Sequence, residues 1–162
     1  SGKHSESWRK RDKNYIIKNK KEEWNNLQYI TKLDRNKLEK YKKRLITEEV
    51  ILTDERLYEH ILLFHENEYK ELRPYLKSII DNPDYIIEDN RHEETMIYLK
   101  QVKNIEKNGR VVIKLALGQD KEHNKNSIIT MMKLNNRTWK QTLKNRGKII
   151  WKNKNKKLDK NE

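Results

Sequence analysis

Three apolar runs, separated by turn residues, decide the fold of this chain. They are Thr95-Met96-Ile97-Tyr98-Leu99-Lys100, Arg110-Val111-Val112-Ile113-Lys114-Leu115-Ala116-Leu117 and Ser127-Ile128-Ile129-Thr130-Met131-Met132. Each run is rich in β-branched and aromatic residues, and Lys107-Asn108-Gly109 and Gly118-Gln119-Asp120 are typical turn sequences. No helical pattern lies between the runs, so they predict an antiparallel meander. Tyr85-Ile86-Ile87 adds a strand before it, and Lys148-Ile149-Ile150-Trp151 is a candidate fifth strand.

Upstream of the meander, the pattern changes to helical. Thr53 followed by Asp54-Glu55 is a helix start, and we expect a helix over residues 54–66. A second helix over 68–80 ends at Asn82-Pro83, with Pro74 marking a first turn or a kink. We also expect helices over 35–45, after Asp34, and over 136–145, and short strands at 28–31 and 50–52. The predicted class is α+β, with N-terminal helices packed on a four- to five-stranded antiparallel sheet.

Charge is unevenly distributed along the 162 residues. The chain is 39% charged and only 33% hydrophobic, with a net charge of +13. Residues 1–45 carry a net +9, residues 46–100 carry −8 and residues 101–162 carry +12. The basic thirds favour a polyanionic partner. The acidic third either pairs with the basic parts or forms the back of a phosphate-binding groove.

The same composition sets the domain organisation. We expect a basic helical extension over 1–26, one domain over 27–152 and a disordered basic tail over 153–162. With no cysteine, disulfides and thiolate metal sites are excluded. No apolar run is long enough to span a membrane and no signal peptide is visible, so we expect a cytoplasmic protein that does not contact membranes.

Two histidines on the 54–66 helix are the first candidates for chemistry. At about 100° per residue, Leu57, Ile61 and Phe64 form the buried stripe. His60 and His65 then lie beyond opposite edges of it, about 140° apart. That spacing does not suit a zinc pair, for which i,i+3 or i,i+4 is needed. Each histidine either faces a cleft beside the helix or hydrogen-bonds a backbone carbonyl at the border of the core.

Polar residues in the strands are the second group of candidates. Ser127 and Thr130 have opposite parity, so only one faces a cleft unless a bulge intervenes. Lys100 and Lys114 end or interrupt apolar strands, where each either reaches water or offers charge to a phosphate.

Further candidates lie in a turn and after the fourth strand. Arg91 lies in the turn before the strand that begins at Thr95. This turn either contacts a phosphate or is a solvated loop. Arg137 and Lys140 flank Trp139, which either stacks a base or anchors a short helix to the sheet.

The sequence contains no Gly-rich phosphate loop, no nucleophile elbow and no cluster at metal-ligand spacing. We therefore expect neither metal nor cofactor. What remains is acid/base chemistry on RNA, in which a base activates the 2′-hydroxyl and an acid protonates the leaving 5′-oxygen.

The order of these motifs resembles a known family. Val50–Arg56, His60-Ile61, His65-Glu66 and Asn82–Asp89, followed by Thr95 to Lys100, Val111–Leu117 and Asn126–Thr130, look like the phage barnase–EndoU–colicin E5/D–RelE-like nuclease domains. The resemblance covers residues 27–152. It implies an α+β fold and metal-independent RNA cleavage by a toxin or effector of a phage or mobile element.

For individual residues, the resemblance implies a role but leaves two candidates for each. His60 or His65 is the implied general acid/base, Thr130 or Ser127 orients a phosphate oxygen, and Lys100 or Lys114 stabilises charge. The expected partners are RNA, such as tRNA or another structured RNA, and an immunity or antitoxin protein. The alternatives are a non-catalytic nucleic-acid-binding module and a protein-interaction domain of a mobile element.

Overall fold

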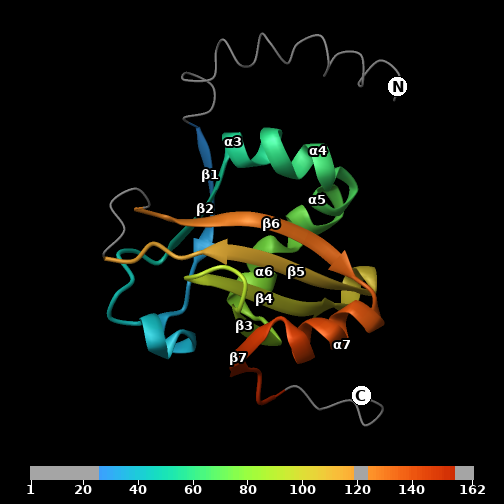
Figure 1. Cartoon of the computed structure of the whole chain (residues 1–162). Helices are drawn as coiled ribbons and strands as arrows, with labels where there is room; N and C mark the ends of the chain where they lie inside the picture. The colour runs from blue at the N-terminus through green and yellow to red at the C-terminus, as the bar shows by residue number, and fades with distance from the viewer. Residues whose placement is uncertain (1–25, 119–123, 156–162) are drawn as a thin grey trace.

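The structure is a computed structural model that describes residues 26–118 and 124–155. These residues form an α+β fold around one mixed sheet, with strand order β1-β2-β6-β5-β4-β3-β7 (Figure 1). The strands are β1 (Leu27–Lys32), β2 (Glu49–Thr53), β3 (Tyr85–Asp89), β4 (Thr95–Val102), β5 (Lys107–Lys114), β6 (Asn126–Leu134) and β7 (Gly147–Lys152). The α-helices are α3 (Asp54–Arg56), α4 (Leu62–Phe64), α5 (Glu66–Leu72), α6 (Leu76–Asp81) and α7 (Asn136–Asn145). Short turns of other helix types are η1 (Arg35–Lys37), η2 (Glu39–Tyr41), η3 (Leu57–Ile61), η4 (Arg73–Tyr75) and η5 (Lys103–Ile105).

The α+β class and the β3-β4-β5-β6 meander are confirmed, but the predicted four- to five-stranded antiparallel sheet is wrong. The described sheet has seven strands and is mixed. β2 joins it in parallel, with Val50 opposite Asn126 and Ile51 opposite Ser127. β1 then pairs with β2, and β7 pairs with the outer edge of β3. The candidate fifth strand is confirmed as β7. The short strands expected at 28–31 and 50–52 were not counted in the sheet, because the pattern of a short strand says nothing about its neighbour.

Several element boundaries also differ from the prediction. The expected helix over 35–45 is two single 3₁₀ turns, η1 and η2, although Asp34 does cap the first by accepting from Asn36 N. The third strand ends at Lys114 and not at residue 117, because the chain there turns toward Leu45 and the start of β6. The second helix is confirmed as α5, η4 and α6, with Pro74 in the 3₁₀ turn. The predicted helical extension over 1–26 and most of the predicted tail lie outside the described residues.

The sheet has a buried core on each face. On one face, α5 and α6 pack Leu72, Leu76 and Ile79 against Val111 and Ile113 of β5. On the opposite face, α7 packs Trp139 against a second cluster of buried side chains; its buried members are Tyr85, Ile87, Ile97, Leu99, Val112 and Leu134. Alternate residues of β4 and β5 therefore belong to different cores, as the pleat of a strand requires. Below, the two faces are called the α5–α6 face and the α7 face.

Asn126 fixes the parallel junction between β2 and β6. Its side chain is completely buried. The Nδ2 group donates to Thr47 O and Glu49 O, both at 2.9 Å, and Oδ1 accepts from Ala116 N at 2.8 Å. One amide thus joins the segment before β2, the segment after β5 and the start of β6.

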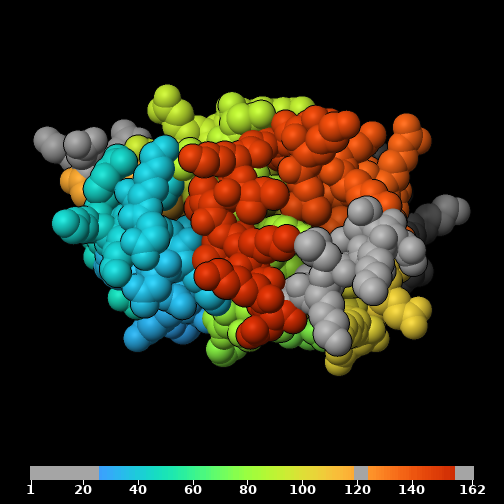
Figure 2. Space-filling model, turned by 90° about the horizontal axis from the view of Figure 1, so that it is seen from below, coloured from blue at the N-terminus to red at the C-terminus, as the bar shows by residue number. Residues whose placement is uncertain are grey.

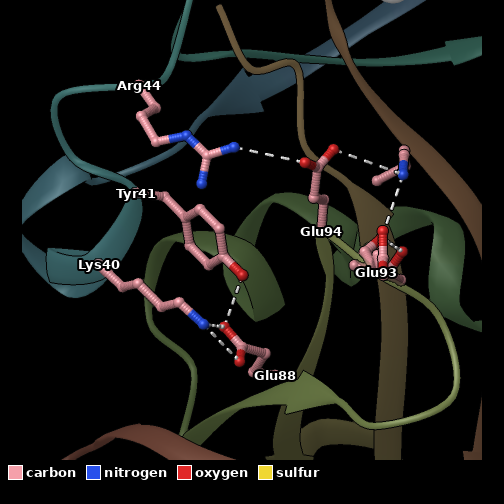
Figure 3. Close-up of polar contacts among 8 residues, drawn as sticks. Lys40, Tyr41, Arg44, Glu88, Glu93 and Glu94 are labelled. Atoms are coloured by element: carbon pink, nitrogen blue, oxygen red, sulfur yellow. Dashed lines mark hydrogen bonds and ion pairs between the residues drawn. The ribbon is translucent and has the colours of Figure 1, made fainter. Parts of the chain in front are cut away.

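A polar network fastens the η1–η2 segment to the sheet (Figure 3). Tyr41 Oη donates to Glu88 Oε2 at 2.6 Å, and Lys40 Nζ donates to both oxygens of Glu88 at 3.0 and 3.2 Å. Burial acts to raise the pKa of Glu88, but these two donors hold that pKa below its ordinary value. Arg44 pairs with Glu94 at 3.4 Å beside the same network.

The η1–η2 segment also borders the last strand. Figure 2 shows β7 beside this segment, at the end of the molecule where the chain leaves the sheet. Lys37 Nζ lies 4.9 Å from the ring centre of Trp151 on β7, a cation–π contact.

Several carboxylates of the acidic middle third form ion pairs within the protein. They pair with basic residues from the first and last thirds of the chain. The pairs are Glu48 with Arg35, Glu49 with Lys125, Glu71 with Lys133, Glu88 with Lys40, Glu94 with Arg44 and Lys114, and Asp89 with Arg146. These contacts favour the first of the two interpretations of the acidic third, pairing with the basic parts.

Replacing Asn126 with alanine removes the partner of three backbone groups at the junction, of which Ala116 N–H is buried and the two carbonyls are part-buried. We expect Asn126→Ala to lower the free energy of unfolding by about 3 kcal/mol, measured by urea denaturation. Asn67→Ala is the matched control, because Asn67 is exposed on α5. A loss no larger than that of the control would show that Asn126 does not hold the junction.

Candidate functional site

The helix that carries the two histidines changes type along its length. Thr53 caps it as predicted, since its hydroxyl accepts from Arg56 N at 3.1 Å. From Leu57 to Ile61 the helix is a π-turn, in which Leu62 N donates to Leu57 O, five residues back. His65 then leaves helical backbone, with φ −139° and ψ 35°, before α5 begins. A π-turn holds more residues per turn than an α-helix, so it changes the angular spacing of the side chains.

This change brings the two histidines together. The ring centres of His60 and His65 are 5.8 Å apart, and the rings are tilted by 58°. The predicted separation to opposite edges of the buried stripe is therefore wrong, because it assumed one continuous α-helix. Leu57 and Ile61 are buried as expected, but Phe64 is 68% exposed and lies outside the stripe. Both histidines are half-buried at the border of the core.

The surroundings of the two rings differ. His65 Nδ1 lies 3.3 Å from Glu68 Oε2, which orients the ring. His60 packs on Phe64, with ring centres 5.4 Å apart. Burial lowers the pKa of His60 below its ordinary value, and the positive charges of Arg56 and His65 lower it further. The lowered pKa favours the neutral form of the His60 ring, which can accept a proton, while His65 is held by the Glu68 carboxylate.

A β-bulge aligns the polar residues of β6. The register with β5 shifts between Val112 and Ile113, so Ile129 is the extra residue on β6. Ser127 is then opposite Lys114 and Thr130 is opposite Val112. Because Lys114 and Val112 are two residues apart, Ser127 and Thr130 share the α7 face of the sheet. The sequence placed Ser127 and Thr130 on one face only if a bulge lay between them, and the structure contains that bulge.

Thr130 has an unusual hydroxyl. Its Oγ1 is buried and has no hydrogen-bond partner in the part of the chain that the structure describes. By contrast, Ser127 Oγ donates to Lys125 O at 3.3 Å. A buried hydroxyl without a partner costs free energy unless something else bonds to it, so Thr130 is a polar group whose bonding the described residues do not satisfy.

The two candidate lysines of the sheet are occupied by protein groups. Lys100 Nζ donates to Asn82 O at 2.6 Å, at the end of α6. Lys114 Nζ donates to Glu93 O at 3.0 Å and lies 3.8 Å from Glu94 Oε2. Their register places Lys100 on the α5–α6 face and Lys114 on the α7 face, so the structure does not bring them together.

The remaining candidates lie on or near α7. Arg137 and Lys140 are exposed on this helix, and Arg91 is exposed in the turn between β3 and β4. Trp139 is buried against Tyr85, with ring centres 6.1 Å apart, so it anchors α7 to the sheet and does not present a face for stacking.

Arg110 is the site residue that the sequence analysis missed. It lies on β5, on the same face as Lys114, and its Nε is buried without a hydrogen-bond partner among the described residues. The available signal was the alternation of Arg110, Val112 and Lys114, which places two cations on one face of an apolar strand.

The described residues thus contain two groups of candidates, the histidine pair and the polar residues of the α7 face. η3 packs against β6, the strand that carries Thr130, but its buried residues Leu57 and Ile61 belong to the core of the α5–α6 face, whereas Thr130 faces the α7 side of the sheet. Within residues 26–118 and 124–155, no three His, Asp or Glu side chains are arranged to hold a metal ion. In the same residues, no helix is long and apolar enough to cross a membrane.

Comparison with protein families gives one match. The model of the phage-Barnase-EndoU-ColicinE5/D-RelE like nuclease2 family matches residues 28–152. The chain belongs to this family. The match confirms the resemblance found in the sequence, and it begins and ends within one residue of the range expected there. No curated protein and no solved structure matches significantly. The described fold of this family member is therefore the mixed seven-stranded sheet with the histidine pair beside β6.

The low pKa of His60 depends partly on Arg56. We expect Arg56→Gln to raise the pKa of His60, because one of the two positive charges that oppose its protonation is removed. The measurement is an NMR titration of the His60 ring protons. Lys70→Gln, on the exposed side of α5, is the control. An unchanged pKa of His60 in Arg56→Gln would mean that Arg56 is too far from the ring to act on it.

Thr130→Val removes the unpartnered hydroxyl with little change of shape. We expect the free energy of unfolding to rise by about 1 kcal/mol, because a buried polar group without a partner is lost. Thr142→Val is the matched control, since the Thr142 hydroxyl donates to Thr138 O at 2.7 Å and its removal should bring no gain. A lower free energy of unfolding in Thr130→Val would reveal a partner for the hydroxyl within the protein.

Proposed function

We propose that this chain is a metal-independent endoribonuclease, a toxin or effector of a phage or mobile element. The family membership supports the nuclease part. The observation that carries the rest is the contact between His60 and His65, with ring centres 5.8 Å apart. Two imidazoles in different surroundings are a suitable acid/base pair at neutral pH.

In the proposed reaction, His60 is the base because its pKa is lowered and its ring is neutral. It takes the proton of a ribose 2′-hydroxyl, and the 2′-oxygen attacks the adjacent phosphorus. The bond from phosphorus to the 5′-oxygen breaks, and His65 gives that oxygen a proton. The products are a 2′,3′-cyclic phosphate and a 5′-hydroxyl. Glu68 orients His65 for this step.

The strand that η3 contacts, β6, carries the polar candidates for the phosphate, on the α7 side of the sheet. The Thr130 hydroxyl has no protein partner among the described residues and is available to a phosphate oxygen. Ser127 is a weaker candidate because its hydroxyl already donates to Lys125 O. Lys100 and Lys114 are held by carbonyl groups, so we assign them to the support of the fold.

RNA is the proposed substrate because DNA lacks the 2′-hydroxyl that this reaction needs. Within RNA, we propose tRNA or another structured RNA as the target. We also propose an immunity or antitoxin protein as partner. The exposed apolar side chains near the histidine pair, Tyr58, Leu63 and Phe64, support a protein contact at that place.

The test is cleavage of total tRNA and rRNA by the full chain in EDTA. We expect cleavage that leaves 2′,3′-cyclic phosphate ends and falls by about 10²- to 10⁴-fold in His60→Ala and in His65→Ala. Asn67→Ala, an exposed change between the second histidine and Glu68, is the matched control and should cleave normally. DNA of the same sequence should stay intact.

Four results would contradict parts of the proposal. Cleavage that stops in EDTA would make the reaction metal-dependent. Cleavage that survives both histidine substitutions would remove the acid/base assignment. RNA that is bound at low salt but never cut would favour the non-catalytic binding module, and a chain that ignores RNA would favour a protein-interaction domain.

A further inference from the structure

Asp89 organises a group of basic side chains at the end of α7. Its side chain is fully buried, and it accepts from Arg91 N at 2.9 Å. His92 Nδ1 lies 3.1 Å from Asp89 Oδ2, and Arg146 Nε lies 3.3 Å from Asp89 Oδ1. Burial acts to raise the pKa of Asp89, but these groups hold that pKa below its ordinary value. Asp89 is therefore an ionised anchor.

Gly147, the residue after Arg146, allows the backbone of β7 to approach β3 closely beside Asp89. Gly147 is opposite Asp89 where β7 pairs with β3. A Cβ on Gly147 would lie 1.9 Å from Glu88 O, so no other residue allows the strands to approach this closely. Arg146, the C-cap of α7, is thereby held beside Asp89.

Arg110 reaches the same region from β5. It lies on the α7 face, as Asp89 does, and both Arg146 and Arg91 act electrostatically on its guanidinium. Its Nε is buried and has no hydrogen-bond partner among the described residues. Burial and the two neighbouring arginines lower the pKa of Arg110, and Asp89 opposes them. Such a half-buried guanidinium is in an unfavourable environment unless an anion joins it.

The charges around this region do not balance. Three arginines act on or near one carboxylate, and within the described residues the side chains of Arg91 and Arg110 make neither an ion pair nor a hydrogen bond. Guanidinium groups bind phosphate in a bidentate manner, and a converging set of them is typical of sites for phosphoryl oxygens. A bound phosphate would satisfy Arg110 Nε and neutralise the surplus charge.

We propose that Arg91, Arg110 and Arg146, held in place by Asp89, form a binding site for a backbone phosphate of the nucleic acid substrate. The identity of the substrate rests on the proposed function, but the anion chemistry of the site does not. Asp89 on β3 is three strand spacings from β6, which is about 14 Å. The site therefore takes a phosphate other than the one that is cleaved beside β6.

The test uses a ligand that cannot be cut. A single-stranded RNA oligonucleotide with 2′-O-methyl groups lacks the attacking hydroxyl, so its affinity is independent of catalysis. We expect Arg110→Gln to weaken its binding by about fivefold or more at low salt and to reduce the slope of log K against log salt by about 0.7. Lys144→Gln removes the same charge from an exposed position on α7 and should weaken binding by less than about twofold.

A second measurement does not depend on the folding of a variant. In the wild-type chain, inorganic phosphate should shift the NMR signal of Arg110 Nε–H in a saturable way, and chloride at the same ionic strength should not. Equal weakening in Arg110→Gln and Lys144→Gln, or an Arg110 signal that phosphate leaves unchanged, would overturn the proposal. Because neither measurement involves cleavage, failure of this site and failure of the proposed nuclease activity give different results.

Discussion

The three hydrogen bonds of the Asn126 amide determine where β6 lies, and most of the structure follows from that position. Asn126 holds β2 parallel to the first residues of β6. β2 is shorter than β6, so the helical segment that leaves Thr53 runs beside the rest of β6. The π-turn with His60 is thus placed next to the strand with Thr130. A single buried side chain therefore connects the fold to both groups of candidate residues.

The sequence predicted well those features that depend on neighbouring residues. The α+β class, the meander, the Thr53 cap and the end of the second helix at Asn82-Pro83 all follow from local patterns, and the structure contains them. The parallel junction was not predictable in this way. It depends on a buried amide whose partners are 77 and 79 residues away in the chain, and no periodicity records such a contact.

The candidate site shows the same division. His60, His65, Ser127 and Thr130 were recognised as polar residues in apolar surroundings, but their arrangement was not. An α-helical wheel separates the histidines, and the π-turn with the break at His65 joins them. A regular strand separates Ser127 from Thr130, and the bulge at Ile129 places them on one face. In both cases an irregularity of the backbone, invisible in residue spacing, forms the site; such irregularities are common at functional positions.

The parallel pairing of β2 with β6 has a consequence for the order of folding. The meander from β3 to β6 joins strands that are close in sequence, whereas β2 must wait for a partner that follows it by more than seventy residues. Closing such a long loop costs conformational entropy before the contacts between the two strands can offset that cost. Long-range pairing of this kind therefore forms late in folding. During synthesis, the segment with His60 and His65 emerges before β6 exists. The two rings therefore reach their place beside β6 only after the ribosome has completed that strand.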